Sequence, residues 1–324
     1  MNGELANDLE AGYGIHVKTM EPVDGGWLNR LWRAETDHGE LLIKQFSPQR
    51  FGPRQLEQIE AALRRQILLQ ADGIPCPRVF LSGGRAVRRW GGTSYTVMEF
   101  VRGKNLPAGL ISLEQMHSLG SLCARMRQAF SKLSATGAKG YPIQEGQVLD
   151  ALWEQYHTRR CALALDSLPD YRRALLAQGL VLNRLSEAFF RRLPKGIAHE
   201  DLTPDNLLFD ENGVTAVIDF DRCCYSFTWH DVGRVVLSFA LEGEQLNRDK
   251  VFAFIEGYTR HLPLAMQDIA DALRITWCIE APWWIQPDYF AMAPCKATRY
   301  REEIVWLTEH WFAIDTLLGL ETLS

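Results

Sequence analysis

Apolar and polar positions alternate along residues 15–45, and short turns interrupt the alternation. The runs IHVKTMEPV, LWRAET and ELLIKQF are separated by DGGWLNR and by the turn DHG. Such alternation, bounded by glycine-containing turns, is typical of antiparallel strands. Two more strand-like runs, RVFLSG and AVRRWGGTSYTVMEFV, follow before residue 102. The first hundred residues therefore predict a small, mostly antiparallel sheet.

Helical periodicity interrupts this sheet once and then dominates the rest of the chain. The segment 54–71 carries an apolar stripe at helical spacing and ends before Gly73 and Pro75, which break helices. The stripe consists of Leu56, Ile59, Leu63 and Ile67. Helical patterns recur from 112 to 193 and again from 230 onward.

This order of elements predicts an α+β fold with two lobes. We expect residues 1–98 to form a small antiparallel β-sheet lobe with one main helix, which would bind a nucleotide. Residues 99–104 would form a hinge. Residues 105–324 would form a larger, mostly helical lobe that holds the catalytic loop and the acceptor pocket.

Composition narrows the class of protein. The chain has 324 residues, 47% hydrophobic and 23% charged, which suits a globular protein with a large core. Its net charge of −5 gives no electrostatic basis for nucleic-acid binding. No apolar run approaches the ~18 residues of a membrane span, and the N-terminus lacks the pattern of a signal peptide. We expect a cytoplasmic protein without nucleic-acid or membrane partners; its oligomeric state is open.

One stretch, HEDLTPDNLLFDENGVTAVIDFD at 199–221, combines polar chemistry with a hairpin pattern. Its two apolar runs are joined by a turn containing Asn212-Gly213, a strong signal for a tight hairpin. A hairpin would return Asp219 to the loop that holds Asp201 and Asn206. Two carboxylates and a carboxamide would then converge. An Asn and an Asp suit Mg²⁺ when phosphate oxygens complete its coordination shell, which leaves Asp201 to act on a hydroxyl.

The pattern HxDxxxxN, followed by a second aspartate, is that of kinases. The sequence resembles the aminoglycoside phosphotransferase and choline kinase-like superfamily, which has a protein-kinase-like fold, from about residue 20 to 310. This resemblance implies an ATP- and Mg²⁺-dependent phosphotransferase, with GTP as an open alternative to ATP. It implies Asp201 as the catalytic residue and Asn206 and Asp219 as the metal ligands.

The resemblance also implies nucleotide-binding residues in the first lobe. Gly25, Gly26 and Asn29 lie where the family has a shortened phosphate loop, and Lys44 lies where a kinase has its phosphate-binding lysine. A plain hairpin turn and a solvated lysine are the alternatives. That lysine normally pairs with a glutamate on the next helix. We favour Glu60, with Glu57 as the alternative.

The run YTVMEFVRG at 95–103 resembles the hinge strand of these kinases. By this resemblance the Glu99 carbonyl and the Val101 amide would bind adenine, and Met98 would border its pocket. Two other residues would be structural: His199 would pack beneath the catalytic loop, and Asp231 would brace it. The role of Glu200 stays open.

The acceptor is predicted to be a small molecule with a hydroxyl group. Asp231 follows Asp219 after twelve residues, which leaves no room for the peptide platform of a protein kinase. Aromatic and acidic residues at 277–312 suit an amino sugar, an aminoglycoside or an amino alcohol, although aromatic residues at helical spacing are more often core. They include Trp283, Trp284, Tyr289, Trp306, Glu280, Asp288, Glu302 and Glu303. The alternatives are a stress-type Ser/Thr protein kinase and a non-catalytic pseudokinase or structural relative.

Overall fold

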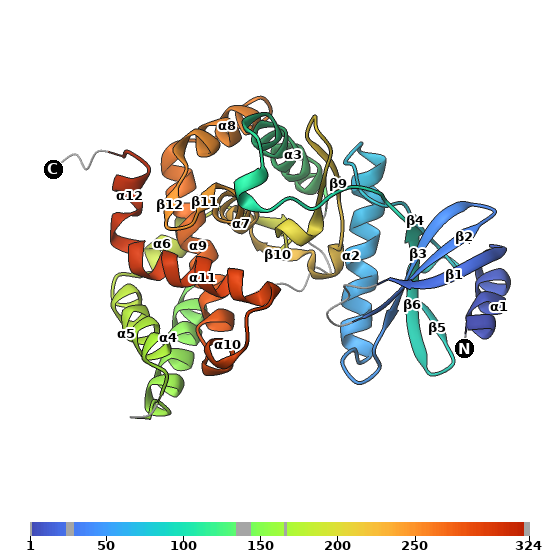
Figure 1. The fold of residues 1–324 in the computed structure, drawn as a ribbon, viewed down its shortest axis with the longest axis horizontal. Coiled ribbons are helices and arrows are strands. Elements are labelled where there is room, and N and C mark those ends of the chain that lie inside the picture. Colours follow the sequence, from blue (N-terminus) through green and yellow to red (C-terminus); the bar gives the residue numbers. More distant parts are fainter. Residues whose placement is uncertain (1, 24–28, 134–143, 165–166, 321–324) are drawn as a thin grey trace.

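The computed structural model describes residues 2–23, 29–133, 144–164 and 167–320. It has two lobes (Figure 1): a β-sheet lobe with two helices, and a larger helical lobe. The predicted α+β bilobed class is confirmed. β6 ends at Glu99 and the first long helix of the second lobe begins at Leu113. The lobe boundaries proposed at 98 and 105 stay predictions; the first falls at the end of β6, and the second falls between β6 and that helix.

The N-terminal lobe is built on a six-stranded sheet with the order β1-β2-β3-β6-β4, in which β5 also pairs with β6. Its strands are β1 (Val17–Val23), β2 (Arg30–Thr36), β3 (Gly39–Phe46), β4 (Val79–Phe80), β5 (Arg88–Trp90) and β6 (Thr93–Glu99). All of these pairs are antiparallel. β2 and β3 pair in register from Thr36 opposite Gly39, so the predicted DHG hairpin is confirmed.

Each face of this sheet is covered by one helix. On one face, α1 (Asn2–Tyr13) buries Leu5 and Leu9 against Ile43 and its neighbours. On the other face, α2 (Pro53–Ala71) buries Ile59 and Leu63. The helix α2 matches the predicted segment 54–71, whereas α1 was not predicted.

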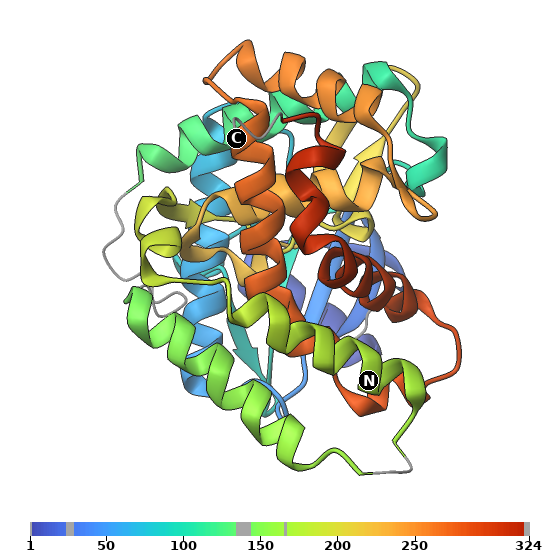
Figure 2. The same cartoon turned by 90° about the vertical axis from the view of Figure 1, so that its left-hand side faces the viewer.

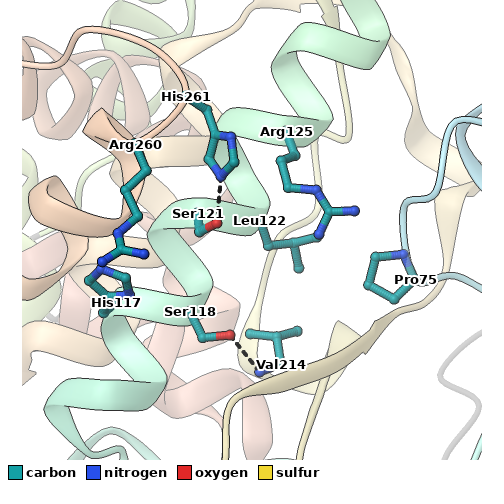
Figure 3. Close-up of a pocket in the computed structure, with 9 residues that line it drawn as sticks. All are labelled: Pro75, His117, Ser118, Ser121, Leu122, Arg125, Val214, Arg260 and His261. Carbon is teal, nitrogen blue, oxygen red and sulfur yellow. Dashed lines mark hydrogen bonds between the residues drawn. The ribbon is translucent and has the colours of Figure 1, made fainter.

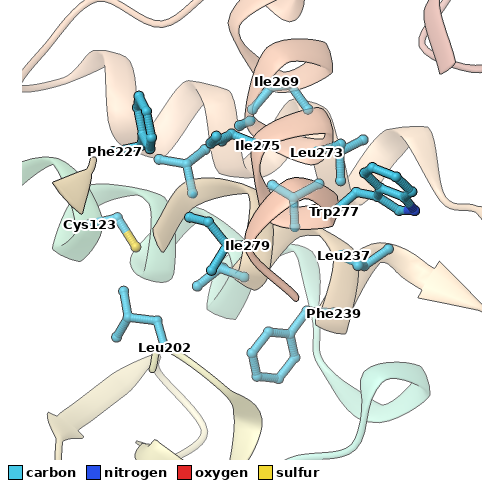
Figure 4. Packing of buried hydrophobic residues seen from close by; sticks show 14 of the residues in the cluster. Cys123, Leu202, Phe227, Leu237, Phe239, Ile269, Leu273, Ile275, Trp277 and Ile279 are labelled. Carbon is cyan, nitrogen blue, oxygen red and sulfur yellow. The ribbon is translucent and has the colours of Figure 1, made fainter. Parts of the chain in front are cut away.

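The C-terminal lobe is mostly helical, and its long helices pack against one another to form the main core. Its helices are α3 (Leu113–Ser131), α4 (Glu145–Cys161), α5 (Pro169–Leu182), α6 (Glu187–Arg192), α7 (Trp229–Ala240), α8 (Arg248–Thr259), α9 (Met266–Trp284), α10 (Pro287–Ala291), α11 (Lys296–His310) and α12 (Ile314–Leu317). Figure 2 shows α4 and α5, in green, side by side. Around α9, side chains such as Leu273, Trp277 and Ile279 pack with Phe239 of α7 and Phe227 (Figure 4).

Two glycines let α3 and α8 touch along their backbones. A Cβ atom on Gly120 would lie 2.0 Å from the Phe254 carbonyl oxygen, and one on Gly257 would lie 1.9 Å from the His117 carbonyl oxygen. Neither position has room for a side chain, so these glycines fix the distance between the two helices.

Three short antiparallel pairs complete the C-terminal lobe: β7 (Lys195–Ala198) with β10 (Cys224–Phe227), β8 (Leu207–Phe209) with β9 (Val214–Val217), and β11 (Leu241–Glu242) with β12 (Gln245–Leu246). The β8–β9 pair confirms the hairpin predicted at Asn212-Gly213. The small β11–β12 pair departs from the wholly helical pattern expected after residue 230. None of the helices in the described ranges is both long and apolar enough to cross a bilayer.

Candidate active site

The loop between β7 and β8 places Asp201 and Asn206 together. A 3-10 helix at Pro204–Asn206 turns the chain into β8. The Asn206 side-chain amide donates to the Asp201 backbone carbonyl at 2.9 Å and to its carboxylate at 3.1 Å. The asparagine therefore holds Asp201 in one orientation, and its own carboxamide oxygen is left for another partner.

The β8–β9 hairpin returns Asp219 to this loop. The Ile218 backbone N–H donates to the Asn206 carbonyl at 3.0 Å, so the residue before Asp219 is joined directly to the other predicted metal ligand. Asp219 itself has φ 61° and ψ 67°. A non-glycine residue in this left-handed region is uncommon and usually has a functional or structural reason. Here the conformation turns the chain out of β9 immediately after the predicted hairpin.

Lys44 joins the N-terminal lobe to this loop. Its Nζ lies 2.8 Å from Asp219 Oδ1 and 2.7 Å from Asp221 Oδ2. The Lys44 side chain is 7% exposed, and although burial opposes its charge, the two carboxylates raise its pKa above the ordinary value. The contact spans the two lobes, so the predicted phosphate-binding cation and the predicted metal ligand lie at one point.

The two carboxylates beside Lys44 differ in their surroundings. Burial raises the pKa of Asp221 to about 6, whereas contact with Lys44 outweighs burial and lowers the pKa of Asp219. The Asp219 side chain is 41% exposed, against 14% for Asp221. Asp219 is therefore the more accessible and more readily ionised of the two, which suits a metal ligand.

Burial also raises the pKa of Asp201 to about 6, although the cation of Arg222 opposes this shift. A carboxylate with a pKa nearer to neutrality is a stronger base than an exposed one. It is active when deprotonated, so activity should be present above its pKa and lost as the pH falls through it.

We therefore predict that kcat/KM falls on the acidic side with a midpoint near the Asp201 pKa of about 6. Below the midpoint the loss should approach about tenfold per pH unit, as for a single essential base. The measurement is a pH profile of kcat/KM with saturating metal. A profile that stays flat well below this midpoint would show that Asp201 does not limit the reaction as a base.

Several groups near this point are available to a nucleotide and a metal. The Asn29 carboxamide oxygen is buried without a hydrogen-bond partner in the described structure. Its loop is the one predicted to hold phosphates; Gly25 and Gly26 of that loop lie outside the described residues. Asn206 and Asp219 supply amide and carboxylate oxygens, the donor set that Mg²⁺ accepts together with phosphate oxygens. These residues fit the implied groups.

The backbone at the end of β6 is compatible with the predicted role of this segment in binding adenine. Phe100 N–H donates to the Glu40 carbonyl at 3.0 Å, which holds the end of β6 against β3. Within the described part of the chain, the Val101 N–H makes no hydrogen bond, as a donor reserved for a base edge requires. Met98 is 5% exposed and packs in the cluster beneath α2. The roles of Met98, Glu99 and Val101 in adenine binding stay predictions.

The expected Lys44–Glu60 pair is wrong for this structure. The Glu60 carboxylate accepts hydrogen bonds from the backbone N–H groups of Ala86 and Val87, at 3.0 and 2.8 Å, and pairs with Arg64 at 2.9 Å. Glu60 is therefore bound by the backbone before β5 and does not pair with Lys44. Nor does Glu57 take its place, because that residue pairs with Arg85.

Asp231 braces the catalytic loop as predicted. Its two carboxylate oxygens accept from the backbone N–H groups of His199 and Glu200, at 2.8 and 2.9 Å. His199 is fully buried with its ring against Phe220, and burial lowers its pKa to about 4. A neutral, packed histidine agrees with the structural role expected for it.

Glu200 belongs to a buried ionic network behind Asp201. His230 lies between the carboxylates of Glu200 and Glu280, at 3.1 Å from each, and Glu280 also pairs with Arg234 at 2.6 Å. Burial opposes the charge of His230, but these two carboxylates raise its pKa to about 10.

The acids at the other end of this network also have partners. Glu303 pairs with Arg234 and Arg299. The network's acids already have cationic partners, so they are not open to an acceptor amine as the sequence suggested.

The aromatic residues of the C-terminal helices divide into two groups. Trp284 packs with Tyr289 and Tyr300, with ring centroids 4.9 and 5.5 Å apart, and Tyr300 OH donates to Asp205 of the catalytic loop at 3.2 Å. This group lies beside the loop. Trp306 is 6% exposed and stacks on His310, so it is part of the core, the alternative that the sequence favoured for these rings, and not of an acceptor pocket.

Two charged residues near Asp201 were not assigned by sequence reasoning. Asp221 is the second partner of Lys44. Arg222 is exposed, and its charge acts on both Asp201 and Glu200. In the sequence, only their position directly after Ile218-Asp219-Phe220 could have indicated a role for these two residues. The chain turns at Asp219, after β9, toward the catalytic loop.

Comparison with known proteins gives consistent matches. A family model described as "Phosphotransferase enzyme family" matches residues 19–264. The homoserine kinase of Methylobacillus flagellatus is 25% identical over 262 residues, which cover 80% of this chain and 76% of the relative.

Solved structures share the fold. An amicoumacin kinase in complex with AMP-PNP and Ca²⁺ has a TM-score of 0.66 at 15% identity, covering 96% of this chain and 94% of the other. The choline kinase of Cryptosporidium parvum has a TM-score of 0.61 at 12% identity, covering 98% and 99%. The superfamily resemblance found in the sequence is confirmed.

Proposed function

This chain belongs to the phosphotransferase enzyme family, and from that premise we propose that it transfers the γ-phosphate of ATP, with Mg²⁺, to the hydroxyl of a small amino alcohol. It is a small-molecule kinase, an activity that requires a nucleotide and a divalent metal. The observation that supports the proposed site best is the contact of Lys44 with Asp219 across the lobes, beside the Asp201–Asn206 pair.

Each residue then has a distinct task. Asp201 accepts the proton of the acceptor hydroxyl and orients its oxygen. Asn206 and Asp219 would hold Mg²⁺, which neutralises charge on the transferred phosphoryl group. Lys44, now paired with two carboxylates, would exchange part of that contact for phosphate oxygens. The Asn29 side chain and the Val101 amide would bind the phosphate and adenine ends of the nucleotide. Catalysis rests on positioning and on charge neutralisation.

The acceptor we favour is an amino alcohol that also carries a carboxylate, such as homoserine. Relatives of this chain are named homoserine kinases. Arg222 supports the same class, because it is exposed, its charge acts on Asp201, and a guanidinium suits a carboxylate. Trp284 and Tyr289 are partly exposed, and their rings would contact the apolar part and the ammonium group of such a molecule.

The test is ADP release with homoserine, choline and an aminoglycoside as separate acceptors. We expect homoserine to be preferred and Arg222→Gln to raise its KM by about tenfold or more, as loss of a charge-assisted hydrogen bond does. The assay should be run at about pH 8, where Asp201 stays ionised without Arg222. Arg54→Gln, an exposed arginine on α2, is the matched control and should leave KM unchanged.

The outcomes separate the acceptor from the reaction. Turnover of the aminoglycoside or choline but not of homoserine would contradict the acceptor and leave phosphoryl transfer standing. Turnover of no acceptor would contradict the function. The protein-kinase alternative is disfavoured because only the short strand β10 lies between Asp221 and Thr228, so no peptide platform intervenes.

A further inference from the structure

A cavity lies on the C-terminal lobe away from the catalytic residues. It has a volume of about 610 Å³ and is bounded by α3, the end of α8, the start of β9 and the loop after α2 (Figure 3). A cavity of this size is in the range of small-molecule sites. Its lining consists of Pro75, His117, Ser118, Ser121, Leu122, Arg125, Val214, Arg260 and His261.

The charged side chains that line this cavity are all cationic. Its lining includes two guanidinium groups, from Arg125 and Arg260, and two imidazoles, from His117 and His261, but no carboxylate. Arg260 has no hydrogen bond or ion pair to its side chain within the described structure. Arg125 donates one N–H to the Gly73 carbonyl, and its other donors stay available. This local excess of cations occurs in a chain whose net charge is −5.

The rest of the lining supplies hydroxyls and a small apolar wall. Ser121 Oγ lies 2.8 Å from His261 Nε2. No third residue orients this imidazole in the described structure, so the pair lacks the arrangement of an activated nucleophile. Leu122, Pro75 and Val214 provide the apolar side. Cations, hydroxyls and a short apolar wall together suit a compact molecule with one phosphate group.

Three walls of the cavity are held in place by direct hydrogen bonds. The Val214 backbone N–H donates to Ser118 Oγ at 3.1 Å, and the Pro75 carbonyl accepts from the Val217 N–H at 2.8 Å. Gly213 has φ 155°, and a Cβ there would lie 2.2 Å from Ser118 Oγ. The α2 loop, α3 and the β8–β9 hairpin are therefore fixed to one another around the cavity, as a preformed binding site requires.

We propose that this cavity is a second binding site, separate from the catalytic centre, for a small phosphomonoester. Figure 3 shows the Arg260 guanidinium directed toward His117 and the Arg125 guanidinium directed toward Pro75, on the other side of Leu122. The phosphate therefore binds the Arg260 guanidinium, and the carbon skeleton lies against Leu122 and Val214. Inorganic phosphate can make the same contacts with the guanidinium group, but it has no carbon skeleton to pack against the apolar wall. It therefore binds more weakly.

The test is calorimetric titration of the full chain with glycerol 3-phosphate and, separately, with inorganic phosphate. ADP and Mg²⁺ are present to occupy the catalytic cleft. Arg260→Gln should raise the dissociation constant of glycerol 3-phosphate by about tenfold, because the loss of one charge-assisted hydrogen bond weakens binding by about that factor. Arg125→Gln should act in the same direction but less strongly, because its guanidinium lies on the other side of Leu122. Arg54→Gln is the matched control and should bind as the wild type does.

Lys44→Met separates this site from the catalytic one, because it changes the cleft and leaves the cavity intact. Binding of glycerol 3-phosphate that survives Lys44→Met and ADP but is lost in Arg260→Gln supports the proposal. Binding that ADP or Lys44→Met abolishes, or that Arg260→Gln leaves unchanged in a variant with wild-type melting behaviour, overturns it. The absence of any binding at millimolar concentration also overturns it. None of these results depends on the identity of the acceptor.

Discussion

Replacing Asp201 by Asn is expected to lower kcat by about 10²- to 10⁴-fold, the usual contribution of a positioned general base. The asparagine keeps the size of the side chain and can still contact Asn206, but it cannot take the acceptor's proton. Affinity for ADP with Mg²⁺ should stay close to the wild-type value, because Lys44 and Asp219 are untouched. Steady-state kinetics and nucleotide titration measure the two effects separately.

The matched control for this variant is Asp150→Asn, which makes the same change at an exposed position on α4. It should leave kcat unchanged. An Asp201→Asn protein with near wild-type turnover would remove Asp201 from the mechanism. A protein that loses nucleotide affinity to the same extent as turnover would instead give Asp201 a binding role.

Asp219→Asn is expected to weaken binding of the metal–nucleotide complex by at least about 10²-fold, since even outer-shell changes at metal sites cost about 10- to 100-fold. The variant loses an anionic ligand for Mg²⁺ and leaves Lys44 with Asp221 alone. Calorimetric titration with AMP-PNP should show the loss when Mg²⁺ is present. With the metal chelated, wild type and variant should differ much less.

Asp221→Asn distinguishes metal binding from pairing with Lys44. Both aspartates contact the lysine, but Asp221 is the more buried, and only Asp219 is assigned to the metal. Asp221→Asn should therefore weaken metal-dependent binding less than Asp219→Asn does. Equal losses in the two variants, with or without metal, would show that Asp219 acts through Lys44 rather than through a metal.

The loop and hairpin at 199–221 could be predicted from sequence because their signals are local. Asn212-Gly213 specifies a tight turn, and a tight turn fixes which residues return to the loop. The contact between Lys44 and Asp219 was foreseeable only through the family resemblance, since 175 positions separate the two residues. The helix α2 was also readable, because its apolar stripe is regular.

The partners of buried charges could not be read in the same way. Glu60 lies on the predicted helix, but whether it meets Lys44 or the amides before β5 depends on how α2 is rotated against the sheet. Glu200 and His230 meet only after the chain has folded across thirty residues. Helix periodicity likewise cannot separate a buried ring such as Trp306 from a partly exposed ring such as Trp284, because both lie on amphipathic helices.

The most direct test of the central claim is ³¹P NMR of a reaction containing the protein, ATP, Mg²⁺ and homoserine. We predict a new phosphomonoester resonance that grows in step with ADP and that forms about 10²- to 10⁴-fold more slowly with Asp201→Asn. Growth of inorganic phosphate alone would contradict homoserine as the acceptor. An equal phosphomonoester signal from the Asp201 variant would contradict phosphoryl transfer by this site.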